Sequence, residues 1–187
     1  MAIINKSNAV VNLTSKQKLP RDRYLVQCIK AVFGVSSGGN PMITLEWQIV
    51  APEAVEIDGV RTIVAGQKYL MQYFPTKVKG DNGEWDAKKT AGAQGRLLEL
   101  FAALGLPNDN IDDENPPVKE LEGIFADAIL DAEESVQRKQ PTPEQKAARQ
   151  LGDEILDANG KKIVSYRPIV PQILNRAEKP SAANAEM

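Results

Sequence analysis

The sequence contains no histidine, one cysteine and few aromatic residues, which make up 5% of its 187 residues. Without histidine, the chain has no Ser-His or Cys-His nucleophile pair, no imidazole general base and no ordinary zinc site. Its acidic residues form no recognisable two-metal nuclease set. We therefore predict a protein that is not an enzyme and that holds no metal or cofactor. The single thiol, Cys28, lies in an apolar run and is predicted to be a small core residue.

Long hydrophobic runs are also absent. No segment is apolar over a length that would span a bilayer, and the N-terminus lacks the pattern of a secretory signal. A lone cysteine suits a reducing compartment. The expectation is a cytoplasmic protein with no membrane partner.

Charge is unevenly spread along the chain, although the formal net charge is only −2. Residues 1–100 carry 13 Lys and Arg against 9 Asp and Glu, a net of +4. Residues 101–187 carry 10 against 16, a net of −6. A basic half beside an acidic half indicates a charged ligand on one face.

Apolar periodicity predicts several strands and one principal helix. In Met42–Ala51, apolar Ile43 and Leu45 alternate with polar residues, as in a half-buried antiparallel strand. The helix is predicted within Thr90–Pro107, after an exposed loop over Pro75–Lys89. The other predicted segments are a strand over Arg23–Phe33, one strand or two over Arg61–Phe74 with a break at Gly66, a strand or helix over Leu121–Val136 with strand favoured, a short helix or solvated insertion over Pro141–Gly152, and a hairpin over Glu154–Pro168 that turns at Asn159-Gly160.

This order of elements predicts a mainly β (α+β) domain. A lone helix between the third and fourth strands is the order of the OB-fold, a five-stranded Greek-key barrel that binds oligonucleotides. An SH3-like barrel and a β-sandwich with one helix are the alternatives. We predict a polar N-terminal arm over residues 1–19, an OB-fold-like domain over residues 20–176 with an insertion near residues 139–152, and a flexible tail over residues 177–187.

Three short motifs carry a family resemblance. The first is an extended strand with Pro20, Tyr24 and Val26, followed by a small polar loop that ends in Asn40-Pro41-Met42 and includes Ser36 and Gly39. The others are "LFAALGLP" over residues 100–107 and "LEG" over residues 121–123. Over Leu19–Leu130 the chain thereby resembles a family of bacteriophage single-stranded-DNA-binding proteins.

The resemblance implies an OB-fold module that coats single-stranded DNA during phage replication or recombination, in the cytoplasm of an infected bacterial host. Its implied partners are single-stranded DNA, further copies of the chain, and phage replication or recombination proteins. The chain departs from many single-strand binders because its last nine residues carry one acid and form no acidic tail. The alternative function is a phage virion or assembly protein that self-associates through a β-barrel.

Non-specific single-strand binding needs cations for phosphates and aromatic faces on which bases stack. Basic and aromatic residues interleave between residues 61 and 96. Trp85 is the sharpest candidate because it lies in a polar loop with no periodic core role, although capping the barrel end is an alternative. Trp47 shares the apolar face of its strand and is predicted to be core. The candidate binding residues are Trp85, Lys88, Lys89, Lys77, Lys79, Tyr73, Lys68, Tyr69, Arg96, Lys30, Ser36, Ser37 and Asn40.

The loop over Gly34–Pro41 is predicted to form one wall of the binding groove, because an OB-fold places its first strand connection there. A plain hairpin loop is the alternative, and the lysine cluster is alternatively a solvated loop. Met71 and Tyr73 occupy one face of their strand, with Leu70 and Phe74 on the other, and the pattern does not decide which face is core. Distant cations that would join the groove if their strands neighbour it are Arg23, Lys161, Lys162 and Arg167.

Overall fold

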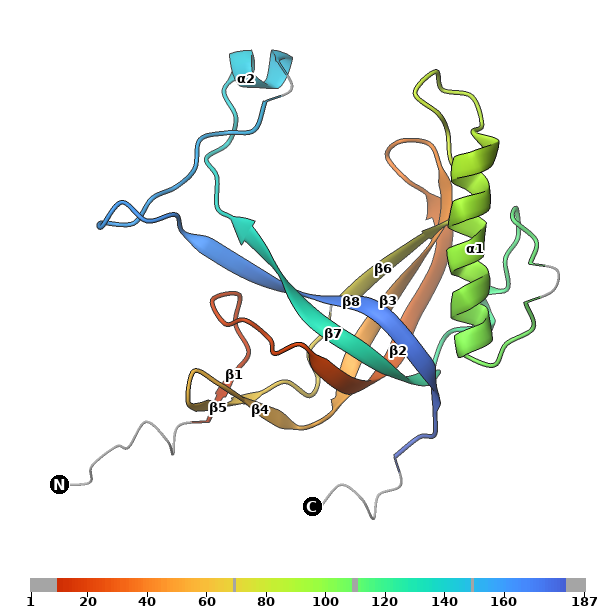
Figure 1. Ribbon diagram of the computed structural model, residues 1–187, viewed down its shortest axis with the longest axis horizontal. Coiled ribbons are helices and arrows are strands. Elements are labelled where there is room, and N and C mark those ends of the chain that lie inside the picture. Colours follow the sequence, from red (N-terminus) through yellow and green to blue (C-terminus); the bar gives the residue numbers. More distant parts are fainter. Residues whose placement is uncertain (1–9, 69, 109–110, 149, 181–187) are drawn as a thin grey trace.

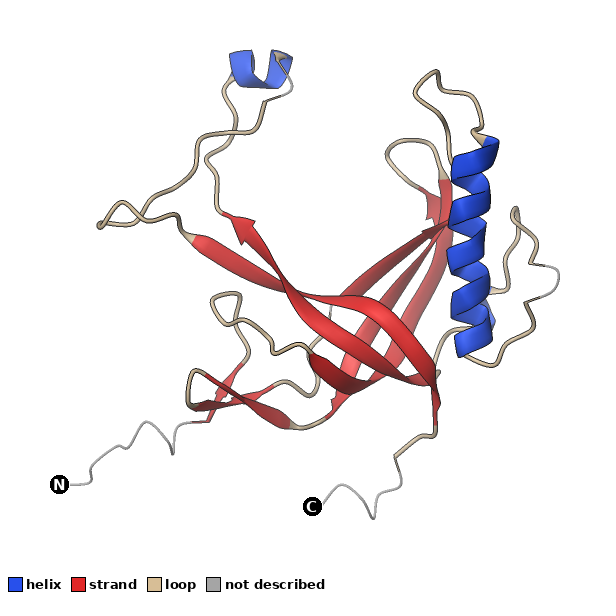
Figure 2. Ribbon diagram, viewed as in Figure 1, coloured by secondary structure: helices blue, strands red, loops and turns tan. Residues whose placement is uncertain are grey.

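The structure is a computed structural model that describes residues 10–68, 70–108, 111–148 and 150–180. The fold is mainly β, with two sheets and one main helix (Figure 1, Figure 2). The elements in chain order are β1 (Val10–Asn12), β2 (Asp22–Val35), β3 (Pro41–Ala51), β4 (Ala54–Ile57), β5 (Val60–Ile63), β6 (Leu70–Pro75), α1 (Ala87–Ala103), η2 (Val118–Glu120), β7 (Phe125–Val136), α2 (Pro143–Ala147) and β8 (Val164–Ala177).

The larger sheet has five strands in the order β6-β3-β2-β7-β8, and every neighbouring pair is antiparallel. Alternation along β3 buries Leu45 and Trp47 completely and leaves the intervening side chains on the outer face. The strand predicted after residue 121 is confirmed as β7. Its alanines, Ala126 and Ala128, are fully buried because a strand places every second residue in the core.

The smaller sheet has the order β1-β5-β4. β4 and β5 form a hairpin whose turn residues, Asp58 and Gly59, both have positive φ, at 52° and 74°. Gly66 has φ of 82° and lies between β5 and β6, so the sequence over residues 61–74 forms two strands that belong to different sheets. β1 pairs in parallel with β5, which attaches residues 10–12 of the predicted arm to the domain.

The core lies between the inner face of the larger sheet and α1. Trp47, Tyr24 and Phe101 are its largest fully buried side chains. Cys28 is buried among them, as predicted, and desolvation raises the pKa of its thiol to about 12. The thiol is therefore protonated and unreactive at neutral pH.

The larger sheet is open rather than closed into the predicted barrel. β6 and β8 lie near each other, but within the described ranges no backbone ladder joins them. The side chain of Gln72 bridges the seam instead: its Nε2 donates to the carbonyl of Val170 at 2.7 Å, and its Oε1 accepts from Trp47 Nε1 at 3.0 Å. Pro168 and Pro171 of β8 have no N–H to donate, which disfavours a ladder at this edge.

Helix α1 begins earlier than the sequence pattern predicts. Asp86 caps it by accepting a hydrogen bond from Lys89 N at 2.8 Å, so the helix starts at Ala87. Lys88 and Lys89 are consequently in its first turn, and not in the predicted exposed loop over residues 75–89. At the other end Gly105 has φ of 64°, in agreement with the predicted stop.

Beyond the core, β7 and β8 continue as a two-stranded ribbon that projects from the sheet toward α2 (Figure 1). The short helix α2 is confirmed, with a capping box between Thr142 and Gln145. No helix in the described part of the chain is long and apolar enough to cross a membrane.

The hairpin predicted over residues 154–168 is only partly formed. Its turn is present, with Gly160 at φ of 75°, and one bridge pairs Leu156 with Lys162. From Val164 onward the chain pairs with β7 instead, because β7 offers a longer partner than the few residues around Leu156.

Candidate nucleic-acid interface

The outer face of β2, β3 and β6 carries a continuous set of side chains across three strands. One row across the strands contains Lys30, Glu46 and Met71, and the next contains Val32, Thr44 and Tyr73. Their inward neighbours, such as Leu70, are buried, so the structure assigns Met71 and Tyr73 to the outer face of β6.

This face is hollowed and unusually apolar for an exposed surface. Tyr73 is 54% exposed and Val35 is 72% exposed. An exposed aromatic side chain provides a flat face on which a nucleobase stacks. A groove of about 280 Å³ is lined by Lys30, Val32, Gly34, Val35, Met42, Thr44, Glu46 and Met71. We call these residues, together with Tyr73, the outer-face groove.

The loop between β2 and β3 stands at one end of this groove and is held by its own polar groups. Ser36 N donates to the carbonyl of Asn40 at 2.9 Å, and Asn40 N donates to Ser36 Oγ at 3.1 Å. Gly39 has φ of 77°, which closes the turn. Ser37 lies at the exposed tip. The predicted wall is thus a compact loop.

A second loop, over residues 76–86, lies beside the first and carries Trp85. The two loops are joined because Lys79 N donates to Asn40 Oδ1 at 2.9 Å. The backbones of Lys79 and Trp85 form an isolated antiparallel β-bridge, and Lys79 Nζ lies 5.3 Å from the centroid of the indole ring. Trp85 is 53% exposed, so its ring is outside the core and one aromatic surface is open to solvent.

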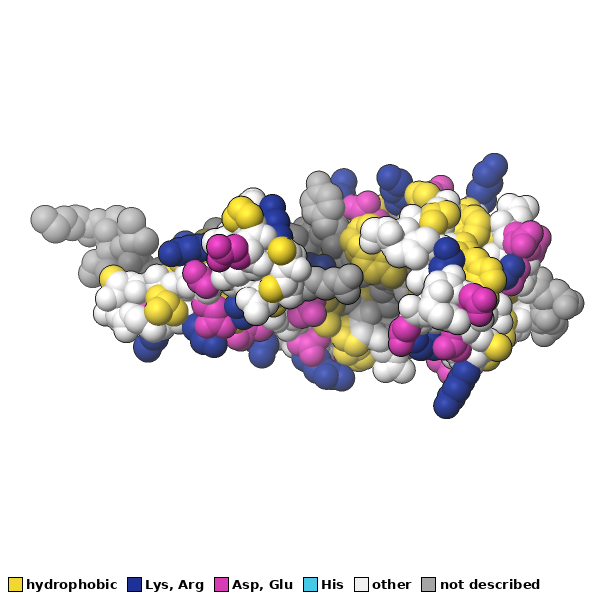
Figure 3. Space-filling view, turned by 90° about the horizontal axis from the view of Figure 1, so that it is seen from above, with side chains coloured by type: hydrophobic (Ala, Val, Ile, Leu, Met, Phe, Trp, Pro, Cys, Tyr) yellow, Lys and Arg dark blue, Asp and Glu magenta, His cyan; other side chains and the backbone are white. Residues whose placement is uncertain are grey.

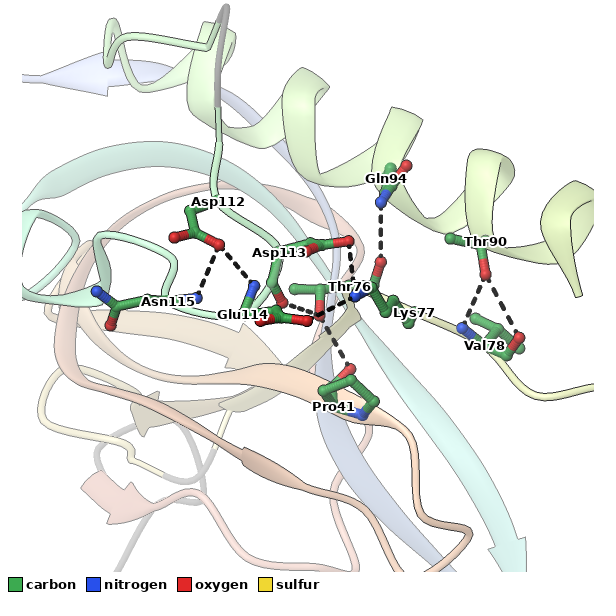
Figure 4. A network of polar contacts seen from close by, with 10 residues as sticks. All are labelled: Pro41, Thr76, Lys77, Val78, Thr90, Gln94, Asp112, Asp113, Glu114 and Asn115. Carbon is green, nitrogen blue, oxygen red and sulfur yellow. Dashed lines mark hydrogen bonds and ion pairs between the residues drawn. The ribbon is translucent and has the colours of Figure 1, made fainter. Parts of the chain in front are cut away.

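A polar network fixes the base of the Trp85 loop against α1 and against the acidic segment over residues 111–115 (Figure 4). Thr76 Oγ1 donates to the carbonyl of Asp113 at 2.8 Å, and Gln94 Nε2 of α1 donates to the carbonyl of Thr76 at 3.1 Å. Val78 N donates to Thr90 Oγ1 at 3.0 Å. The loop therefore rises from an anchored base.

The predicted lysines differ in how far their charge is compensated. Lys77 Nζ lies 3.2 Å from Glu114 and 3.3 Å from Asp113, and these two carboxylates raise the pKa of Lys77 (Figure 4). Lys89 Nζ lies 3.4 Å from Asp81. By contrast, three exposed lysines of the candidate binding set form no ion pair with any described residue: Lys30, Lys68 and Lys88.

Several predicted residues lie elsewhere. Arg96 lines a separate cavity of about 380 Å³ at the seam between β6, β8 and α1. Arg23 pairs with Asp127 on β7 at 2.6 Å, and Lys162 pairs with Glu154 at 2.9 Å. Tyr69 is outside the described residues.

Seen from above, the end of the molecule that bears both loops and α1 shows hydrophobic side chains among both basic and acidic ones (Figure 3). The side chains that the structure adds to this region were not singled out from the sequence. They are Val32, Val35, Met42, Thr44, Glu46 and Met71. A signal was available, because the alternation in residues 42–51 already separates Thr44 and Glu46 from the core face.

Among the described residues, no group of three or more Cys, Asp or Glu side chains is placed to hold a metal ion. In comparisons with known proteins, no family model, curated sequence or solved structure matches the chain. The function must therefore be argued from the groove and loops themselves.

Proposed function

We propose that the chain is a sequence-independent single-stranded-DNA-binding protein of a bacteriophage, built on an OB-fold and coating strands during replication or recombination. The observation that carries the proposal is the outer-face groove with exposed Tyr73 at its edge, beside a loop that holds Trp85 half exposed. Bases stack on such surfaces without being identified, because every base has an aromatic face.

The strand order supports the OB-fold part of the proposal. Five antiparallel strands with α1 between β6 and β7 follow the OB-fold order, and that fold is often only partly closed. In an OB-fold the second and third strands and the loop after the first strand contact the ligand. Here these correspond to β3, β6 and the loop over residues 36–40, which border the groove.

The arrangement of charge supports binding along a single strand. Lys30 is at the groove, Lys68 lies just before β6, and Lys88 lies three residues after Trp85. Uncompensated cations attract phosphates, and at Lys30 this attraction acts beside the groove that the bases would fill.

Tryptophan fluorescence tests the proposal directly, because the two tryptophans differ in environment. Trp47 is fully buried and Trp85 is 53% exposed, so a base stacked on Trp85 quenches one of the two fluorophores. We expect a single-stranded oligonucleotide to quench the emission, with an affinity that falls as salt rises. The Trp85→Phe variant, which keeps an aromatic ring, should bind without this quenching.

Anisotropy of labelled single-stranded and duplex oligonucleotides provides the matching affinity measurement. Tight binding without quenching would move the site away from Trp85. No binding to either form at low salt would contradict the proposal, and particle formation by the same sample would favour the virion or assembly role.

A further inference from the structure

Glu46 is the one acidic side chain of the outer-face groove. It lies at the centre of the three strands, opposite Lys30 on β2 and Met71 on β6. Its neighbours toward the loop end are Thr44 and Val32. A carboxylate is the least expected group in a surface that attracts phosphates, because its charge has the same sign as theirs.

The charge of Glu46 is not cancelled by an ion pair. Although Lys30 is its direct register partner, no salt bridge to Glu46 is formed by any described residue. Acids on β7 behave differently, since Asp127 and Asp131 each pair with an arginine. The groove floor therefore presents a partly exposed carboxylate to whatever enters it.

The two forms of DNA would meet this carboxylate differently. A single strand has free N–H groups on the edges of its bases, and a carboxylate accepts hydrogen bonds from such groups. In a duplex those edges are paired, and the phosphates form the outer surface that a protein meets first. A carboxylate in the floor thus favours bases turned inward and repels a duplex backbone.

We infer that Glu46 is a specificity-determining residue that makes the groove prefer single strands over duplex DNA. This inference rests on the proposed function. It assigns to Glu46 a role opposite to that of the surrounding lysines: they supply affinity for any phosphate chain, and Glu46 restricts which chain lies in the groove.

The test compares Glu46→Gln with Glu56→Gln. Glutamine keeps the size and polarity of glutamate and removes the charge. Glu56 is exposed on β4 in the smaller sheet, so its variant makes the same change of net charge away from the groove. Affinities for one single-stranded oligonucleotide and for its duplex are measured by anisotropy at two salt concentrations.

We expect Glu46→Gln to lower the ratio of single-strand to duplex affinity by about threefold or more, chiefly through tighter duplex binding. Glu56→Gln should leave the ratio unchanged. Glu46→Lys, with Glu56→Lys as its control, should enlarge the difference. Unchanged thermal melting of each variant shows that the fold is retained.

An equal ratio in wild type, Glu46→Gln and Glu56→Gln would overturn the inference while leaving single-strand binding by the wild type intact. A wild type that binds neither form would instead overturn the proposed function, and the inference with it. The two failures are distinguished by the wild-type titration alone.

Discussion

Charged side chains are paired differently in two regions of the five-stranded sheet. Toward β7 and β8, two arginines pair with acids of β7: Arg23 of β2 lies 2.6 Å from Asp127, and Arg167 of β8 pairs with Glu133. On the side of β2, β3 and β6, Lys30 forms no ion pair with a described residue and lies among exposed apolar groups. In one region the charges of the arginines are balanced by neighbouring acids, and in the other the charge of Lys30 is not.

The difference shows why charge counted along the chain is a poor guide to the ligand face. The pairing of β2 with β7 brings arginines of the basic half against acids of the acidic half. Part of the charge asymmetry along the chain is therefore balanced by ion pairs within the fold. Among the exposed lysines that form no ion pair with a described residue, Lys30 is the one that lines the outer-face groove.

The two tryptophans offer the largest contrast. Trp47→Ala removes a fully buried ring and leaves Gln72, which it hydrogen-bonds, without that partner. We expect this variant to lose about 3–5 kcal/mol of unfolding free energy. Trp85→Ala removes a half-exposed ring and should change that free energy by less than about 0.5 kcal/mol. Urea denaturation measures both, and similar losses would contradict the assignment of one ring to the core and the other to the surface.

For single-strand binding, in contrast to stability, we expect the larger effect from Trp85. Trp85→Ala is expected to weaken single-strand binding by about 1–3 kcal/mol, the range for loss of one stacked base. Trp85→Phe should lose less, because phenylalanine also stacks. Anisotropy titrations at fixed salt measure the difference. If the alanine variant bound as tightly as the wild type, stacking would have to reside on Tyr73 and the groove alone.

The lysines and arginines separate the two sides of the sheet by salt dependence. Replacing Lys30 and Lys68 by alanine should reduce the slope of log affinity against log salt by about 0.7 for each lost phosphate contact. Replacing Arg23 and Arg167, which already pair with acids, should leave the slope near that of the wild type. Equal effects of the two double variants would mean that both sides contact the strand.

The sequence was sufficient for most of the fold because its signals were local. Alternation in β3, the turn at Asn159-Gly160 and the apolar face of α1 each depend on neighbouring residues alone. The open seam was not predictable in this way. The groups that meet at the seam, such as Gln72 and Val170, are far apart in the sequence and come together only in the folded chain.

The residues of the candidate site were likewise predictable only where the signal was local in the sequence. Trp85 was singled out because a tryptophan in a polar loop stands out, and the structure places it beside Lys79, whose backbone N–H donates to Asn40. The outer-face groove was anticipated only in part, through Lys30, Tyr73 and the adjoining loop, because its residues come from three strands. The pairing of Lys77 was not predictable, since its partners Asp113 and Glu114 lie more than thirty residues away in the sequence.

The ion pairs of the β7 side give the smallest expected effect, visible as a dependence of stability on pH. The hydrogen bond from Arg23, with a further one from Asn175, lowers the pKa of Asp127 below its ordinary value of 3.8. A carboxyl whose pKa is lower in the folded state stabilises the fold above its unfolded pKa and loses that contribution as pH falls through the folded pKa. Wild type should therefore exceed Asp127→Asn in unfolding free energy by a constant amount from pH 7 to about pH 5, and by less below about pH 4.

Urea denaturation across this pH range measures the difference, and Arg23→Gln provides the control. Because Arg23 is the main cause of the lowered pKa, the Asp127→Asn change should have little pH-dependent effect in the Arg23→Gln background. A difference that persisted undiminished to pH 3 would show that the asparagine variant loses packing rather than charge. The contribution of Asp127 to stability would then come from packing. The contrast between the paired arginines and the unpaired Lys30 would rest on the salt dependence of binding alone.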